Sequence, residues 1–345
     1  MTARFALPPG SEADAPPERR GLARDAVRLL VTTPDGLAHR HFHDLPDQLD
    51  AGDLLVVNTS ATLPAAVEAR RGDGRLLPLH VSTSLDDGSW VVEPRQPDGS
   101  GPDRSLLAGE RLRLADGAHL RLEAAYPDPA AVTIRLWRAT VSPPQAAAEH
   151  LSRHGQPIRY GYVSGRYPIE DYQTVYAAEP GSAEMASAGR PFTPELLVRL
   201  LAKGVTVAPI VLHAGVSSPE PHEPPLPERY DVPQATARLV NSARAAVRRV
   251  VAVGTTVVRA LETVAGPYGT VRPGSGWTDL VLGPDRPARV VTGLVTGLHA
   301  PEASHLRLLE AVAGRRLVEL SYQAAVAEGY LWHEFGDTML YRTDR

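Results

Sequence analysis

The chain of 345 residues contains no cysteine and only one lysine, Lys203. The absence of thiols excludes disulfide bonds, thiolate metal sites and cysteine nucleophiles. With a single lysine, Schiff-base chemistry and lysine-dependent phosphate loops are nearly excluded as well. No apolar run reaches the roughly 18 residues of a membrane span, and residues 1–21 lack the apolar core of a signal peptide. We therefore expect a cytoplasmic protein that does not engage a membrane.

Neither sign of charge is in large excess. The 36 lysines and arginines and 40 acidic residues give a net charge of −4 at pH 7, which argues against a protein that coats nucleic acid by charge alone. Because nearly all of the cations are arginine, the composition still allows a local basic surface. The 43% of hydrophobic residues suffices for one large domain or two unequal ones. Composition leaves both a monomer and a homo-oligomer open.

The hydrophobic pattern changes twice along the chain. Residues 28–33 and 52–58 predict buried strands, and from about 65 to 140 short alternating runs with turns such as "PDGSG" predict a β-rich module. After residue 145, strands alternate with helices, which predicts a parallel sheet or barrel. The predicted organisation is an α/β domain built from residues 1–62 and 143–345, with a small all-β domain inserted at residues 63–142.

A strand-to-helix turn offers a candidate anion site. The buried strand at 248–256 breaks at Gly254, and the N–H groups and hydroxyls of Gly254, Thr255 and Thr256 would face an anion at the helix start. Arg259, one turn into the helix, could grip a carboxylate or phosphate. The alternative is that Thr256 only caps the helix and Arg259 pairs with a neighbouring acid.

Two histidines follow predicted strands in similar positions. His213 ends "VTVAPIVLH" (205–213), and His299 follows the strand within 288–299. Both would lie at the C-terminal edge of one sheet, where they could converge on a pocket as acid and base. The alternative is that each is structural. Ser304 is predicted to cap the helix that follows His299.

The stretch "ASAGRPFTPELL" (186–197) leads into another helix. Thr193 is predicted to cap it, Pro194 suits its first position, and it should end at Lys203–Gly204. Leu196, Leu197, Leu200 and Leu201 would form its apolar stripe. The approach to this helix consists of small residues with one cation, Arg190, whose purpose the local sequence does not explain.

The sequence contains little evidence for a metal site or a nucleotide-binding loop. His39, His41 and His43 alternate in "HRHFH" (39–43), and we expect an exposed strand there rather than a metal site. The chain lacks H-E-x-x-H, G-x-S-x-G, phosphate-loop and complete G-x-G-x-x-G motifs, which removes the commonest hydrolase and nucleotide-loop interpretations.

Motifs that match one family extend over the whole chain. They are "RDAVRLL" (24–30), "HDLPDQLDAGDLLVVN" (43–58), "YQTVYAAEPGSAEMASAG" (172–189), "FTPELL" (192–197), "LLAKGVTVAPIVLHAG" (200–215), "ERYDVP" (228–233), "VVAVGTTVVRALE" (250–262), "PGSGWTDLVL" (273–282), "VTGLHAPEAS" (295–304) and "FGDTML" (335–340). In order and spacing, the chain resembles the S-adenosylmethionine:tRNA ribosyltransferase-isomerase family of queuosine biosynthesis.

The resemblance implies a barrel-like α/β domain that carries an inserted β-barrel. It also implies a reaction in which the ribosyl part of S-adenosylmethionine is transferred to 7-aminomethyl-7-deazaguanine in tRNA and isomerised to an epoxycyclopentanediol. Adenine and methionine are released, so S-adenosylmethionine is a substrate. No metal is needed, because the sulfonium acidifies the adjacent C5′ protons and is a good leaving group. The protein must supply a base, orientation and a dry pocket.

Within that reaction, His299 is expected to act as general base or acid, with His213 and Arg259 as the other catalytic residues. Thr255, Thr256 and Arg259 are expected to hold the methionine carboxylate or a ribose hydroxyl, and Arg190 to act as a cation on the acceptor side. The expected substrate-binding residues are Tyr172, Gln173, Glu179, Ser187, Gly189, Arg190, Gly215, Gly254, Thr255 and Thr256.

Several loops depart from the family pattern. The family turn A-P-T-A-G-L-H-F-T ends here as "AGRPFT" (188–193), so Pro191 stands where the family has a histidine. L-H-V-G-x-G-T-F becomes "LHAGVSSP", H-S-E-Y becomes "LPER" with Leu226 in place of a histidine, and T-N-F-H-L-P becomes "TGLHAP", which keeps His299. These changes cluster at the expected working edge, so we predict a reshaped acceptor pocket.

Two other functions stay open. One is a diverged enzyme that uses S-adenosylmethionine with a small-molecule acceptor, or cleaves or eliminates it without tRNA. The other is a non-catalytic protein that binds S-adenosylmethionine or RNA. Adenine release without RNA would indicate the first, and binding without adenine release under any acceptor would indicate the second.

Overall fold

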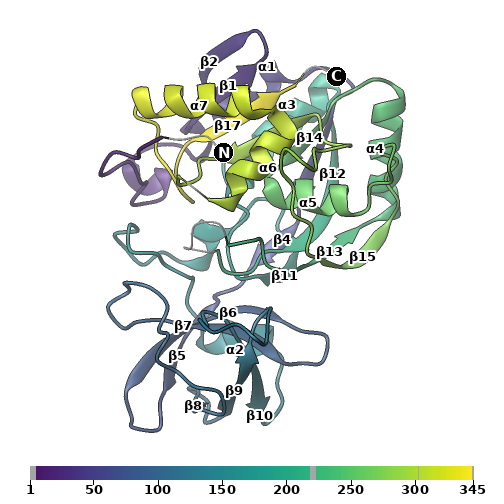
Figure 1. The fold of residues 1–345 in the computed structure, drawn as a ribbon. Coiled ribbons are helices and arrows are strands. Elements are labelled where there is room, and N and C mark those ends of the chain that lie inside the picture. The colour runs from purple at the N-terminus through teal and green to yellow at the C-terminus, as the bar shows by residue number, and fades with distance from the viewer. Residues whose placement is uncertain (1–4, 218–222, 302, 344–345) are drawn as a thin grey trace.

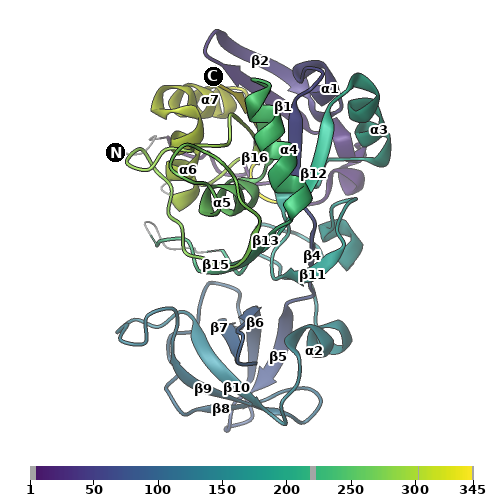
Figure 2. The ribbon, with the colours of Figure 1, turned by 90° about the vertical axis from the view of Figure 1, so that its right-hand side faces the viewer.

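The computed structural model describes residues 5–217, 223–301 and 303–343. A larger α/β domain and a smaller β-barrel lie one above the other in Figure 1. Figure 2 shows the same separation after a quarter turn, with the barrel attached to the α/β domain on the side of β4 and β11. The predicted α/β fold with an inserted β-barrel is confirmed.

Among the described residues, nine strands form the sheet of the larger domain, in the order β15-β13-β12-β3-β14-β16-β17-β1-β2. They are β1 (Arg28–Thr33), β2 (Gly36–His41), β3 (Leu54–Asn58), β12 (Thr206–His213), β13 (Glu228–Val232), β14 (Val250–Val253), β15 (Gly274–Thr278), β16 (Gly293–Gly297) and β17 (Thr338–Arg342). The four neighbours β12, β3, β14 and β16 are parallel. Their carboxyl ends therefore lie at one edge of the sheet.

Both faces of the central strand β3 are buried, which explains its continuous apolar sequence. Leu54 and Val56 belong to one hydrophobic cluster, and Leu55 and Val57 belong to another, because successive side chains of a strand point to opposite faces. The first cluster includes residues of α4–α6 and the longest helix α7, and the second includes residues of α1 and α3. The sheet is thus covered on both sides.

The α-helices of this domain follow the strand-helix alternation that the sequence predicts. They are α1 (Leu45–Gln48), α3 (Pro194–Lys203), α4 (Gln234–Ala245), α5 (Thr255–Thr263), α6 (Ser304–Ala313) and α7 (Arg315–Ala327). The 3-10 helices are η1 (Pro17–Arg20), η2 (Arg24–Ala26), η3 (Phe42–Asp44), η4 (Ile169–Tyr172) and η5 (Ser187–Gly189).

Helix α3 begins and ends where local signals place it. The Thr193 hydroxyl accepts a hydrogen bond from the N–H of Leu196 at 3.1 Å, and Gly204 ends the helix at φ +91°, a conformation that glycine adopts without a steric penalty. The apolar stripe is narrower than predicted, because Leu201 is 56% exposed. The prediction for Ser304 is wrong: it is the first residue of α6, and Ala303 occupies the cap position without a side-chain bond.

The smaller domain is a closed barrel in the order β10-β7-β6-β5-β8-β9. Its strands are β5 (Ala66–Arg70), β6 (Leu76–Ser84), β7 (Trp90–Pro94), β8 (Arg111–Arg113), β9 (His119–Ala125) and β10 (Trp137–Ser142), all inside the range 63–142 predicted for the insertion. Helix α2 (Ala147–His154) contributes Ala147 and Leu151 to the core of the barrel. The short parallel pair β4 (Ser60–Thr62) and β11 (Glu179–Ser182) lies between the domains (Figure 1).

The histidine-rich stretch forms an exposed strand only in part. β2 ends at His41, and His43 lies in η3, so the three histidines do not share one strand as predicted. The rings of His41 and His43 stack with centroids 5.3 Å apart, whereas His39 Nδ1 lies 2.8 Å from the Tyr330 hydroxyl. None of the helices in the described parts of the chain is long and apolar enough to cross a bilayer.

Candidate active site

The predicted site residues gather at the carboxyl edge of the parallel strands. His213 is the last residue of β12, Gly254 follows β14 directly, and His299 lies two residues after β16. Asn58, which sequence reasoning did not assign to the site, is the last residue of β3 between them. The edge faces β4, β11 and the junction with the barrel (Figures 1 and 2).

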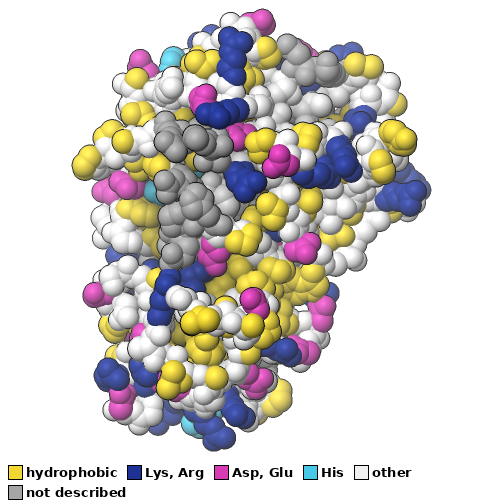
Figure 3. All heavy atoms as spheres, in the orientation of Figure 1, with side chains coloured by type: hydrophobic (Ala, Val, Ile, Leu, Met, Phe, Trp, Pro, Cys, Tyr) yellow, Lys and Arg dark blue, Asp and Glu magenta, His cyan; other side chains and the backbone are white. Residues whose placement is uncertain are grey.

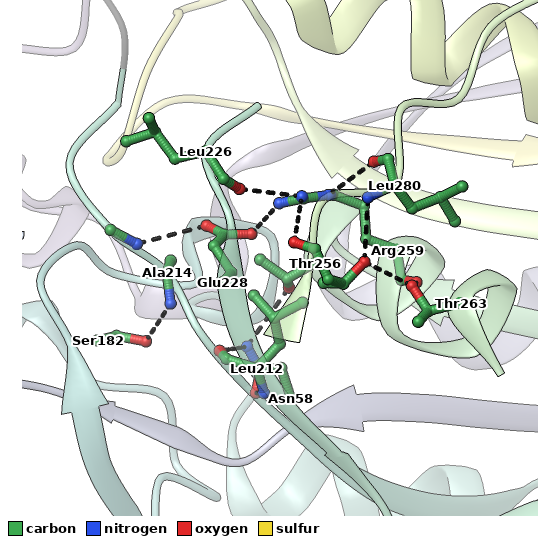
Figure 4. A network of polar contacts seen from close by, with 12 residues as sticks. Asn58, Ser182, Leu212, Ala214, Leu226, Glu228, Thr256, Arg259, Thr263 and Leu280 are labelled. Atoms are coloured by element: carbon green, nitrogen blue, oxygen red, sulfur yellow. Dashed lines mark hydrogen bonds and ion pairs between the residues drawn. The ribbon is translucent and has the colours of Figure 1, made fainter. Parts of the chain in front are cut away.

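Asn58 ties three elements together at this edge (Figure 4). Its side-chain amide donates to the carbonyl of Leu212 at 2.8 Å and to the Thr256 hydroxyl at 3.4 Å, and its Oδ1 accepts from the N–H of Leu212 at 3.0 Å. The residue is 1% exposed, so each polar atom needs a partner inside the protein. The signal that points to it is one amide at the end of an otherwise apolar strand.

The turn from β14 into α5 leaves backbone donors at the helix start. Gly254 has φ +92° and donates its N–H to the carbonyl of Val295 at 2.8 Å. Helix α5 has no side-chain cap, so the alternative that Thr256 caps it is wrong. Its hydroxyl instead accepts from Asn58. The first N–H groups of a helix lack intrahelical partners, and the helix dipole favours an anion there.

Arg259 is engaged inside the protein in this structure (Figure 4). Its guanidinium forms an ion pair with Glu228 and donates to three carbonyl groups, those of Leu226, Thr278 and Leu280. Arg259 is 5% exposed, and Glu228 in turn accepts from the N–H of Gly215 at 3.3 Å. Burial raises the pKa of Glu228, although Arg259 opposes this shift. The arrangement is the ion pair that the sequence left open as the alternative for Arg259.

His213 stands at the end of a chain of hydroxyl groups. Its Nδ1 lies 2.8 Å from Ser60 Oγ, which lies 2.6 Å from Ser182 Oγ. Ser182 Oγ also accepts the N–H of Ala214 at 3.0 Å. Among the described residues, one direction gives every hydroxyl hydrogen an acceptor: Ser182 donates to Ser60, and Ser60 donates to His213 Nδ1. The proton of the neutral imidazole is then on Nε2.

The imidazole of His213 lines a cavity of about 270 Å³ between the two domains, near the lower end of the roughly 300–1,000 Å³ typical of ligand pockets. Arg229 contributes to the same lining, and Val81 and Leu151 supply apolar wall from the barrel side. Burial lowers the pKa of His213, and Arg229 adds to the effect. A Cβ on Gly181 would lie 2.4 Å from His213 Nδ1, so only glycine leaves room for the ring.

His299 lies further along the same edge. Its Nε2 is 3.1 Å from the Thr296 hydroxyl, and its ring stacks on His305 with centroids 4.4 Å apart. Burial holds the pKa of His299 well below its ordinary value. Since β3 and β14 separate β12 from β16, three strand spacings, about 14 Å, lie between the strands that carry His213 and His299. A ligand must extend along the edge to reach both.

Arg190, whose purpose the local sequence does not explain, is buried and forms contacts inside the protein. It is 2% exposed, donates Nε to the carbonyl of Asp171 at 2.8 Å, and pairs with Glu18 at 2.9 Å. Its guanidinium also lies 5.2 Å from the centre of the Phe335 ring. Burial lowers the pKa of Arg190, and Glu18 opposes the shift. The cation therefore joins η1, η4 and the segment before β17 to the start of α3.

Three more of the predicted residues frame the edge from β4 and β11. Gln173 pairs with the backbone of Thr62, accepting its N–H at 2.9 Å and donating to its carbonyl at 2.8 Å. Tyr172 is buried, and its carbonyl accepts the Thr62 hydroxyl at 2.8 Å. Glu179 is exposed at the start of β11.

Close packing surrounds the remaining predicted residues. A Cβ on Gly189 would lie 2.1 Å from the Tyr176 hydroxyl, and one on Gly215 would lie 2.6 Å from the Ser82 hydroxyl. The Ser187 hydroxyl would lie 3.8 Å from a Cβ on Gly297, the last residue of β16. The two closer glycines therefore have no room for a side chain unless a neighbour moves.

A cluster of carboxyl and tyrosine side chains lies beside the site and was missed from the sequence. Tyr160 and Ser217 donate to Glu184, and Tyr162 donates to Glu334. Burial raises the pKa of Glu184 and raises that of Glu334 to about 7. These residues are far apart in sequence and carry no local pattern, so only the fold brings them together.

Two groups in the described residues have a spacing that could hold a metal ion. One is His41, His43 and Asp44, and the other is Asp116, His150 and His154 on the barrel. Neither includes a residue of β12, β3, β14 or β16. Asp116 is already engaged with His150 Nδ1 at 3.1 Å.

Comparison with known proteins places the chain in a family. A family model described as queuosine biosynthesis protein matches residues 2–341. The S-adenosylmethionine:tRNA ribosyltransferase-isomerase of Moorella thermoacetica is 38% identical over 97% of both chains. The protein of that name from Thermus thermophilus is 37% identical over 92% of this chain and 93% of its own.

A solved structure shows the same fold. The crystal structure of the S-adenosylmethionine tRNA ribosyltransferase from Thermotoga maritima covers 98% of each chain, with 30% identity and a TM-score of 0.52. The similarity thus includes the inserted barrel as well as the α/β domain. The chain belongs to the S-adenosylmethionine:tRNA ribosyltransferase-isomerase family of queuosine biosynthesis proteins.

Proposed function

We propose that this protein transfers the ribosyl part of S-adenosylmethionine to 7-aminomethyl-7-deazaguanine in tRNA and isomerises it, with release of adenine and methionine. The observation that carries the proposal is the extent of the similarity. Relatives named for this activity match at 37–38% identity over 92–97% of the chain, so the similarity includes both domains and the edge between them. We place the reaction in the cytoplasm, with no metal requirement.

The turn into α5 is suited to the anionic end of S-adenosylmethionine. Its methionine part carries a carboxylate, and the N–H groups of Thr255 and Thr256 at the helix start are donors of the required kind. Gly254 allows the backbone to make this turn at φ +92°, where other residues would be strained. We assign these three residues to carboxylate binding.

The two histidines suit different tasks. The low pKa of His299 keeps its imidazole neutral, the form that accepts a proton, and the C5′ proton beside a sulfonium is acidic enough for a weak base. We assign that step to His299. The hydroxyl chain behind His213 leaves Nε2–H as its donor, so we assign His213 a hydrogen bond to an acceptor atom of a substrate ring in the cavity.

Arg259, Gln173 and Arg190 are better suited to positioning than to direct contact. Each is engaged with backbone groups, and the two arginines also with carboxylates. Through Glu228, Arg259 fixes Gly215 in the loop that follows His213. We propose that these residues hold the edge in shape, with Tyr172, Ser187 and Gly189 packed beside them.

The test is an incubation of the purified protein with S-adenosylmethionine and tRNA that carries 7-aminomethyl-7-deazaguanine. We expect adenine by chromatography and, after nuclease digestion, a modified nucleoside whose mass corresponds to the added epoxycyclopentanediol. tRNA that lacks the aminomethyl group is the matched control and should give no product. A parallel reaction with a metal chelator should proceed at an unchanged rate. Absence of adenine with the correct tRNA would refute the proposal.

One observation favours a second candidate function. Pro191 stands where the family pattern has a histidine, and the adjacent Arg190 is buried rather than directed to an acceptor. A reshaped acceptor side suits an enzyme that releases adenine from S-adenosylmethionine with a small-molecule acceptor or with none. Adenine formed at the same rate with and without tRNA would support this candidate.

A further inference from the structure

The outer face of the barrel carries a set of arginines that the proposed chemistry does not use. β8 and β9 alternate between inward leucines and outward polar residues. We define the barrel arginine face as the outward residues Arg70 on β5, Arg111 and Arg113 on β8, and His119 and Arg121 on β9. In Figure 3, Lys and Arg side chains lie at the lower end of the barrel, with Asp and Glu side chains among them, where Figure 1 labels β8, β9 and β10.

Like charges lie directly opposite one another on this face. The register pairs Arg111 with Arg121, and Arg113 with Arg70 on its other side. Directly opposed like charges destabilise a sheet. Across the part of the chain that the structure describes, no ion pair is formed by Arg111, Arg113 or Arg121. Glu68 on β5 and Glu123 on β9 also face outward, but the Glu123 carboxylate accepts a hydrogen bond from the Thr140 hydroxyl. The three arginines therefore lie on the barrel surface without an ion-pair partner among the described residues.

The spacing of these cations fits a polyanion with regular charges. Arg111 and Arg113 are two residues apart on one strand, about 6.7 Å, and the neighbouring strand lies about 4.8 Å away. Successive phosphates of an RNA strand have a comparable separation. Guanidinium groups bind phosphate in a bidentate manner, and such contacts fix the position of a nucleic acid without reading its sequence.

We propose that the barrel arginine face binds the ribose-phosphate backbone of tRNA while the acceptor base reaches the sheet edge of the α/β domain. The identity of the RNA rests on the proposed function. A protein of net charge −4 has no general attraction for RNA, so a local basic face has to supply it. This also gives the inserted barrel a task in a reaction whose candidate catalytic residues lie in the other domain.

The test compares two triple variants of equal net charge. The first is Arg111→Gln, Arg113→Gln and Arg121→Gln, and the matched control is Arg238→Gln, Arg272→Gln and Arg316→Gln, three exposed arginines of the α/β domain. Binding of labelled tRNA is measured by fluorescence anisotropy from about 50 to about 200 mM salt, the range in which phosphate contacts dominate. Affinity for S-adenosylmethionine is measured by calorimetry.

We expect the barrel variant to bind tRNA at least about tenfold more weakly and to lower the slope of log affinity against log salt by about 2 to 3, since each phosphate contact contributes roughly 0.7–0.9. Its affinity for S-adenosylmethionine and its kcat should match the control, with only KM for tRNA raised. Equal tRNA binding by the two variants would overturn the inference. Binding of both variants to vesicles of anionic lipid is measured in parallel. Loss of vesicle binding by the barrel variant, with its tRNA binding intact, would also overturn the inference.

The two proposals fail in different ways. If wild-type protein forms no adenine but the barrel variant still loses tRNA affinity relative to the control, the inference stands and the proposed function fails. If wild-type protein forms the modified nucleoside and both variants bind tRNA alike, the proposed function stands and the inference about the barrel fails.

Discussion

Replacement of Ser60 by alanine tests the hydroxyl chain that orients His213. Ser60 is 3% exposed, and its hydroxyl links Ser182 Oγ to His213 Nδ1. Without it, the buried Ser182 hydroxyl loses its acceptor, whereas the half-buried imidazole can turn toward the cavity. One buried polar group left without a partner costs about 1–3 kcal/mol. An unfolding entropy of about 2.1 cal/mol/K per residue over 345 residues corresponds to roughly 1.4 °C per kcal/mol, so the melting temperature should fall by about 1–4 °C.

A structural loss alone would give that result, so a second measurement follows the imidazole itself. In protein labelled with ¹⁵N-histidine, we expect wild-type His213 to show an unprotonated Nδ1 and a protonated Nε2 at neutral pH. The S60A variant should lose this fixed pattern, and adenine release should slow by roughly two- to tenfold, the value of one hydrogen bond. His213→Gln, which keeps a donor near Nε2, should retain more activity than His213→Asn.

Ser321→Ala is the matched control, because Ser321 is fully buried and its hydroxyl bonds to Tyr341 at 2.6 Å. It should lower the melting temperature by a similar amount and leave the His213 signals and adenine release unchanged. If His213 carries its proton on Nδ1 in the wild type, or if S60A and S321A affect adenine release equally, the assignment of the donor is refuted.

Three further predictions follow from the same contacts. Gly181→Ala should displace the His213 ring and reduce adenine release more than tenfold, as judged against Gly161→Ala, where no neighbour lies within 4 Å. Burial lowers the pKa of His80 to about 3, so protonation of this residue below pH 6.5 favours the unfolded state. Between pH 8 and pH 5, the free energy of unfolding of the wild type should therefore fall by about 2 kcal/mol relative to that of H80L, as measured in urea. A difference between the two proteins that stays constant with pH would contradict this. Arg190→Met should lower the free energy of unfolding by about 1–3 kcal/mol. This is less than the value for a fully buried ion pair, because the carboxylate partner Glu18 is 35% exposed. R190K should recover part of the loss, and equal stability of R190M and wild type would rule out a stabilising role for the Arg190–Glu18 pair.

Local signals in the sequence predict the elements well. Helix α3 has a cap, a proline at its first position and a terminal glycine within one short stretch, and all three act as expected. The prediction for Ser304 fails because a serine can also occupy the first turn when the preceding residue adopts the cap conformation. His43 leaves the predicted strand because η3 begins at Phe42, whose side chain is buried against Phe192.

Contacts between distant residues could not be predicted from one sequence. Arg190 pairs with Glu18, 172 positions away, and no periodicity connects them. The strand-end pattern placed His213 and His299 at one edge, but not the two strands that separate them. Asn58 was visible only as the polar end of an apolar strand, and its role as a tie depends on which strands become its neighbours.

Most polar side chains at this edge bond to other groups of the protein, which limits the kind of catalysis that the edge can perform. Arg259, Arg190 and Asn58 are directed at backbone and carboxylate groups of the protein itself, so few groups are free to polarise a substrate. Among the described residues of this edge, the donors available to a ligand include the helix-start amides of α5 and the Nε2–H of His213. The imidazole of His299, whose pKa is held low by burial, is available as a base. Such a set can hold and orient a ligand but supplies little driving force. It suits a substrate such as a sulfonium, which carries its own leaving group and acidifies its own proton.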